Sequence, residues 1–156
     1  MKPKSIKLLL ITLLYFPFAY SQALTTDSLF MYRSEDDFVE TISRLKNILK
    51  KNGYDFIKVQ NVDKGLRKNG YVTDNYKTVF FAKTKHMSKL INKYPETLTY
   101  LPLKITIYSE GDETILISLN PIHLSHTFIE KEMSKILNHW SIHLKHILSN
   151  ASTSEY

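Results

Sequence analysis

The chain has 156 residues, of which 23% are charged, and carries a formal net charge of +6. This length suits one compact domain with its own hydrophobic core. The sequence contains no cysteine, which excludes a disulfide framework, a thiolate metal site, covalently attached haem and a cysteine nucleophile.

The N-terminal residues have the three-part pattern of a secretory signal peptide. Residues 1–7 form a short basic segment, residues 8–18 are almost entirely apolar, and residues 19–23 carry small side chains at alternate positions. The apolar run is about half of the roughly 20 residues that a membrane-spanning helix needs, which disfavours an anchor. We therefore expect export to the periplasm or the extracellular space.

The expected signal peptide comprises residues 1–21, with cleavage before Gln22 or Leu24. A single α+β domain is expected at 24–149, followed by a polar tail at 150–156. Cleavage would remove three lysines and no acidic residue, so the mature chain is much less basic than the precursor. This weakens the case for nucleic acid as a partner.

The first predicted elements are a strand at 28–33 and a helix from Glu35 to about Asn52. Ser34 is the expected helix cap, followed by acids in the first turn. Apolar residues at helical spacing form one stripe: Phe38, Ile42, Leu45, Ile48 and Leu49. Gly53 suits a left-handed stop.

Two further strands are predicted at 54–60 and 76–82, with a loop between them at 61–75. The loop contains two glycines and a basic cluster, and we expect no more than one helical turn in it. Residues 83–94 are predicted to form a short helix that Pro95 ends.

The next segments alternate apolar and polar residues, which predicts a hairpin of strands 101–108 and 114–119 around a turn at 110–112. The face expected to point inward carries Leu101, Leu103, Ile105, Ile107, Ile115, Ile117 and Leu119. The opposite face would carry Lys104, Thr106, Tyr108, Thr114, Leu116 and Ser118. Such a half-polar face is either solvated or an interface.

A long last helix is predicted after Pro121, with Thr127 and Glu130 as a capping box. Its apolar stripe comprises Ile129, Met133, Ile136, Leu137, Trp140, Leu144, Ile147 and Leu148. The stripe predicts that the helix, with Trp140, packs against the sheet.

Together these elements predict an α+β fold in which one mostly antiparallel sheet has two main helices packed on one face. The order is β-α-β-β-β-β-α, with a short helix inserted before the fourth strand.

Several segments between Phe38 and Leu148 share an order and spacing with a known family. They are Leu-Lys-Lys-Asn-Gly-Tyr-Asp-Phe at 49–56, Thr-Val-Phe-Phe-Ala at 78–82, Tyr94-Pro95 followed by Leu-Pro-Leu-Lys-Ile at 101–105, and Leu-Asn-Pro at 119–121. The chain resembles the domain of unknown function 302 family. The resemblance implies a compact α+β fold and a homodimer, and no known reaction.

The chain also departs from that family's pattern at two places. Members usually place an Asp-His pair after the second strand, where this chain has Gln-Asn-Val-Asp at 60–63. The family's Gly-Asn-Pro turn is replaced by Ala-Lys-Thr-Lys at 82–85. No site built on those residues can be carried over.

Histidines on the last helix are the strongest candidates for chemistry. His139, His143 and His146 are spaced by 4 and 3, so a helix places them in one stripe that zinc or copper could bind. The same stripe lies at the edge of the apolar face, where histidine rings pack at the rim of a core. His123 and His126 precede the helix and could join such a site or merely belong to a loop.

Two functional hypotheses remain. The first is an exported, soluble, non-enzymatic module that forms a homodimer or binds a small ligand or partner through its sheet face or a groove beside the last helix. Its basic residues would contact an anionic partner or be solvated: Lys64, Arg67, Lys68, Lys83, Lys85, Lys89 and Lys93. The second is a metal-handling protein or enzyme that uses the histidine stripe. No motif identifies a catalytic residue or a cofactor.

Overall fold

The structure, a computed structural model, describes residues 28–128 and 130–153. The expected signal peptide, Ile129 and residues 154–156 lie outside these ranges. The elements, in chain order, are β1 (Leu29–Ser34), α1 (Phe38–Lys51), β2 (Asp55–Asn61), α2 (Val62–Lys68), β3 (Tyr76–Ala82), α3 (Thr84–Lys93), the 3-10 helix η3 (Pro95–Thr99), β4 (Leu103–Glu110), β5 (Glu113–Leu119), the 3-10 helix η4 (Pro121–Thr127) and α4 (Lys131–Ser152).

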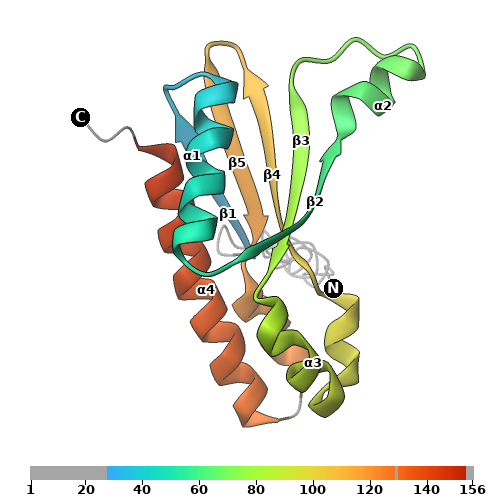
Figure 1. Ribbon diagram of the computed structural model, residues 1–156, viewed down its shortest axis with the longest axis vertical. Helices are drawn as coiled ribbons and strands as arrows, with labels where there is room; N and C mark the ends of the chain where they lie inside the picture. The colour runs from blue at the N-terminus through green and yellow to red at the C-terminus, as the bar shows by residue number, and fades with distance from the viewer. Residues whose placement is uncertain (1–27, 129, 154–156) are drawn as a thin grey trace, which may run out of the picture.

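The five strands form one antiparallel sheet in the order β1-β5-β4-β3-β2. α1 and α4 lie side by side on one face of this sheet (Figure 1). The predicted α+β class, the element order and the short helix before the fourth strand are therefore confirmed. The loop expected at 61–75 instead begins with α2, a helix of two turns.

The main core lies between the sheet and the two helices. Apolar residues of α1 and α4 meet those of the three central strands, and the fully buried ones include Leu45, Leu49, Phe81, Ile105, Ile107, Leu116, Leu144, Ile147 and Leu148. The spacing of the apolar residues in both helices accounts for this packing. In the described part of the chain, no helix has the length and apolarity that crossing a bilayer requires.

The predicted facing of β5 is wrong. A three-residue turn at 110–112 would pair Ile107 with Ile115, but the turn has only two residues, and Glu110 pairs directly with Glu113. Ile107 is therefore opposite Leu116, and this shift by one residue exchanges the two faces of β5. The helix side carries Leu116, with Thr114 and Ser118, whereas the face turned away from the helices carries Ile115, Ile117 and Leu119.

The start of α1 also differs from the prediction. β1 continues to Ser34, which pairs with Thr114 and is buried. The cap is Asp37, whose Oδ1 accepts a hydrogen bond from the backbone N–H of Glu40 at 2.8 Å. The Ser34 hydroxyl accepts instead from Thr41 Oγ1 of α1 and from the backbone N–H of Asp36 in the turn between β1 and α1.

Both ends of α4 differ from expectation. Asn120 and Pro121 start η4, which runs through Thr127, and an extended Phe128 follows, so Thr127 and Glu130 form no capping box. At the other end the helix continues to Ser152, because Ala151 is buried in the main core. The polar tail expected from residue 150 therefore begins after the helix, at Thr153 within the described residues.

The face of the sheet that points away from α1 and α4 is partly apolar. Leu29 pairs with Leu119 and Met31 pairs with Ile117, which places these four side chains together across β1 and β5. Leu29, Met31 and Leu119 are 49%, 54% and 41% exposed. Lys104, Thr106 and Tyr108 of β4 lie on this face, as predicted from the alternation.

A groove between α3 and α4

α3 is an amphipathic helix that buries none of its residues. It lies opposite the first half of α4, beyond the end of the sheet that α1 does not cover (Figure 1). Its apolar residues Met87 and Leu90 are only half-buried. Because an amphipathic helix normally turns its apolar face to a core, the incomplete burial indicates that α3 stands off from its neighbours.

A second, smaller core fixes the C-terminal end of α3. Tyr94, Phe128, Met133 and Leu137 are buried together, and Leu90 packs at the edge of this cluster. The ring of Phe128 meets that of Tyr100 edge-on at 5.9 Å between centroids. The helix is thus held at Tyr94, whereas its preceding turns border an open space.

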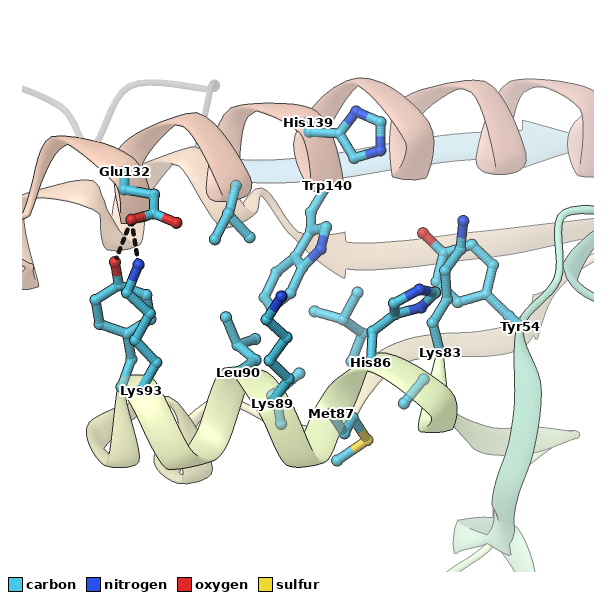
Figure 2. Close-up of a pocket in the computed structure, with 15 residues that line it drawn as sticks. Tyr54, Lys83, His86, Met87, Lys89, Leu90, Lys93, Glu132, His139 and Trp140 are labelled. Carbon is cyan, nitrogen blue, oxygen red and sulfur yellow. Dashed lines mark hydrogen bonds and ion pairs between the residues drawn. The ribbon is translucent and has the colours of Figure 1, made fainter.

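That space is a groove of about 380 Å³ between α3 and α4 (Figure 2). This volume lies within the range of small-molecule sites, which is about 300–1,000 Å³. Apolar and aromatic side chains form most of its lining: Tyr54, Ala82, Met87, Leu90, Tyr94, Leu101, Leu103, Ile136 and Trp140. Trp140 is only half-buried in the groove wall and packs against the second core, so it is not buried against the sheet as expected.

One end of the groove is closed by an ion pair. Glu132 Oε2 accepts hydrogen bonds from Lys93 Nζ at 2.5 Å and from the Tyr94 hydroxyl at 3.0 Å (Figure 2). The hydrogen bond from Lys93 holds the pKa of Glu132 below its usual value, and the same bond raises the pKa of Lys93. This end of the groove therefore has its charges balanced.

The other end is basic. Lys83 Nζ lies over the ring of Tyr54, 4.8 Å from its centroid, and burial raises the pKa of the Tyr54 hydroxyl. His86 extends from α3 toward Tyr54 and Lys83, and Lys89 extends from the middle of α3 toward α4 (Figure 2). Among the residues that the structure describes, the Lys89 ammonium has no ion-pair partner.

The predicted histidine stripe is only partly brought together. The rings of His139 and His143 lie 4.2 Å apart between centroids, whereas His146 contacts the side-chain amide of Asn150 at 3.3 Å. Burial, followed by the nearby His139 and Lys83, lowers the pKa of His143. Within 28–128 and 130–153, no three His, Asp or Glu residues are arranged so that they could hold a metal ion.

Comparison with known proteins identifies the family. Residues 30–151 match the family model described as a domain of unknown function, DUF302. The chain belongs to the DUF302 family. A crystal structure of an uncharacterized conserved DUF302 protein from Bacillus stearothermophilus superposes with a TM-score of 0.73 at 18% identity, over 80% of this chain and 98% of that one. No curated protein matches the chain.

The structural match supports the fold of this DUF302 protein and gives no reaction.

The basic residues that the sequence singled out lie in two separate parts of the fold. Lys83, Lys89 and Lys93 line the groove, whereas Lys64, Arg67 and Lys68 belong to α2 at the opposite end of the sheet (Figure 1). Arg67 is already paired with Asp63.

The other two candidate histidines of this DUF302 protein, His123 and His126, belong to η4 and do not line the groove. Among the described residues, the histidines of the lining are His86 and His139. Sequence reasoning anticipated a groove beside the last helix but missed His86, Tyr54 and Trp140 as its walls. The amphipathic pattern of residues 84–93 could have indicated these walls. It predicts an apolar helix face, and no further helix was predicted to cover that face.

Proposed function

We propose that the protein is an exported, non-enzymatic module that binds a small, largely apolar ligand in the groove between α3 and α4. The observation that carries this proposal is the apolar side of α3, whose half-buried Met87 and Leu90 line an open groove. A ligand with apolar surface would be stabilised there by removing that surface from water. Export rests on the N-terminal signal pattern.

The polar groups of the groove favour binding over catalysis. Its carboxylate, Glu132, is already bound to Lys93 and Tyr94. His86 and His139 therefore have no carboxylate in the described lining that would orient them as a general acid or base.

Trp140 makes the proposal easy to test, because it is the only tryptophan of the chain and it lines the groove. Titration with 1-decanol is expected to change its fluorescence in a saturable manner. Leu90→Glu places a charge in the groove wall and should abolish the change. Leu98→Glu is the matched control, because Leu98 is an exposed leucine of η3 outside the lining. No saturable signal in the unmodified protein would refute the proposal.

A second proposal concerns assembly: we infer a homodimer through the open face of the sheet. Its support is the exposed apolar group formed by Leu29, Met31 and Leu119 on neighbouring strands. Apolar patches of this kind tend to be matched to a partner, and a self-complementary pairing satisfies both copies with one patch.

Light scattering at micromolar concentration tests the dimer. The unmodified protein is expected to have twice the monomer mass, and Met31→Lys is expected to be monomeric. Val39→Lys introduces the same charge at another exposed apolar position, on α1, and should remain dimeric. A monomeric mass that does not change on concentrating would refute this assembly.

Metal handling by the histidine stripe has weaker support, because His146 is separated from the His139–His143 pair by its contact with Asn150. Elemental analysis of purified protein and calorimetric titration with zinc or copper test it directly. A one-site micromolar signal that His143→Ala removes would favour metal handling over the non-enzymatic module.

A further inference from the structure

The lining of the groove has an excess of positive charge. Three lysines line it, Lys83, Lys89 and Lys93, against Glu132 as the acidic residue of the described lining. Glu132 forms an ion pair with Lys93, so no carboxylate of the described lining compensates the positive charges of Lys83 and Lys89. A groove with an apolar wall and uncompensated cations is complementary to a ligand that is apolar along most of its length and negative at one point.

The charges are unevenly placed along the groove. In Figure 2 the Lys93–Glu132 pair closes one end, Leu90 and Trp140 lie in the middle, and His86 and Lys83 lie at the other end. His86 can donate a hydrogen bond there, and the ammonium of Lys83 lies over the face of Tyr54 and forms no ion pair among the described residues. The anionic group of a ligand is therefore expected at the Lys83 end.

We propose that the groove binds a single alkyl chain that ends in a carboxylate, with the carboxylate beside Lys83 and His86 and the chain running past Leu90 and Trp140 toward the Lys93–Glu132 pair. This inference rests on the proposed function and adds the chemical class of the ligand. Lys89, in the middle of α3, covers the chain with its methylene stem and keeps its ammonium in water.

The physical basis is the difference between the two ends. A carboxylate beside Lys83 gains charge-assisted hydrogen bonds, and partial exclusion of water by the groove strengthens them. At the other end Lys93 is already paired with Glu132, so a carboxylate there would meet no uncompensated positive charge. Burial is the main cause that lowers the pKa of the neighbouring His143, and the charges of His139 and Lys83 act in the same direction.

The test compares four probes by Trp140 fluorescence at one ionic strength: decanoate, 1-decanol, decyltrimethylammonium and acetate. Decanoate is expected to bind about tenfold or more tightly than decanol, because one charge-assisted contact is worth about that factor. The ammonium probe should bind more weakly than decanol, and acetate should give no saturable signal. Raising the salt concentration should reduce the preference for decanoate.

Two variants locate the carboxylate. Lys83→Gln is expected to weaken decanoate binding about tenfold and to narrow the preference for decanoate over decanol. Lys85→Gln removes the same charge from an exposed residue of α3 outside the lining and should leave both affinities unchanged. Circular dichroism of both variants confirms that the fold is retained.

The outcomes separate the two proposals. If decanoate, decanol and the ammonium probe bind with equal affinity, the groove binds apolar chains whatever the charge of their end group. The proposed function then stands, and only the present inference fails. If acetate binds as well as decanoate, the alkyl chain is not recognised and the inference also fails. If no probe gives a saturable signal, both proposals fail. If Lys83→Gln and Lys85→Gln behave alike, the carboxylate is not held at the Lys83 end and the inference is overturned.

Discussion

Ser141 in the middle of α4 donates a hydrogen bond to Oδ1 of Asn120, 2.6 Å away, and both residues are buried. The same oxygen accepts from the backbone N–H of Ile122 at 3.3 Å and so caps η4. One amide oxygen therefore connects the end of β5, the start of η4 and the long helix that forms a wall of the groove.

Replacing Asn120 by Ala is expected to lower the free energy of unfolding by about 1–3 kcal/mol, because it leaves the Ser141 hydroxyl and the Ile122 N–H without this acceptor. Ser141→Ala should cost less, about 0.5–1.5 kcal/mol, because the cap of Ile122 remains. Urea unfolding of both single variants and the double variant measures the coupling. Simple additivity of the two losses would show that the hydrogen bond does not connect them energetically.

Arg44 joins α1 to two other parts of the fold. Its guanidinium pairs with Asp36 at 2.6 Å and donates to the backbone carbonyl of Ala151 at 3.2 Å, and its side chain is only 17% exposed. Arg44→Met should lower the free energy of unfolding by about 1.5–3 kcal/mol, the usual range for hydrogen bonds to charged groups. Arg33→Met is the matched control, because Arg33 pairs with Glu110 and Glu113 at an exposed site, where water screens the ion pairs, and it should lower the free energy of unfolding much less than Arg44→Met does. Equal losses in urea unfolding would contradict this ranking.

Gly111 sets the register of the β4–β5 hairpin. It has a positive φ of 61° in the two-residue turn between Glu110 and Glu113. Gly111→Ala should therefore cost about 1–2 kcal/mol, the usual penalty of a left-handed alanine. Gly65 in α2 does not have a positive φ, and a Cβ added there would meet open space. Gly65→Ala should therefore raise the free energy of unfolding by about 0.5–1 kcal/mol. Thermal unfolding distinguishes the two signs, and no loss of stability in Gly111→Ala would contradict the role given to the turn.

The order of the elements could be read from the sequence because periodicity and turn residues are local signals. The inner and outer faces of β5 could not, because they depend on whether the turn has two or three residues. One residue of turn length exchanges Leu116 with Ile115 and Ile117, and the local pattern of apolar residues fits either choice. The same limit applies to the start of α1, where pairing of Ser34 with Thr114 decides that the strand continues.

The groove was harder to predict than the fold. The apolar stripe that contains Trp140 and Ile136 is continuous with that of Leu144 and Leu148, and spacing alone places all of them on one core. In the structure, the sheet covers only the second half of this stripe, and the first half meets the second core and the groove. How far a helix extends past its sheet is a tertiary property that helical spacing does not contain.

The position of Trp140 changes the expected cost of truncating it. A tryptophan buried against the sheet would lose about 3–5 kcal/mol on replacement by Ala. Because Trp140 is half-buried in the groove wall, Trp140→Ala should cost less than Leu148→Ala, whose side chain is fully buried in the main core and for which about 2–5 kcal/mol is expected. Urea unfolding monitored by circular dichroism ranks the two variants, and the reverse order would show that the groove wall contributes more stability than the main core.

His143 gives the fold a defined pH dependence. Burial is the largest cause that lowers its pKa from the ordinary 6.5, and the charges of His139, Lys83 and His146 act in the same direction. The neutral imidazole is therefore favoured in the folded chain, so the unfolded chain binds more protons at and just below pH 6.5. Stability must consequently fall as the pH is lowered through this range.

Urea unfolding midpoints between pH 7.5 and pH 5 test this dependence. The unmodified protein is expected to lose stability on acidification, and His143→Gln should flatten the profile because it removes the group whose proton affinity changes on folding. His126→Gln, at an exposed position in η4, is the matched control and should retain the slope. Burial tends to raise the pKa of Asp63, but hydrogen bonds from the Lys64 N–H and Arg67 outweigh it and lower this pKa from 3.8. The contribution of Asp63 to stability is therefore lost only at pH values below the tested range, so it does not interfere. An unchanged slope in His143→Gln would assign the acid sensitivity to another group.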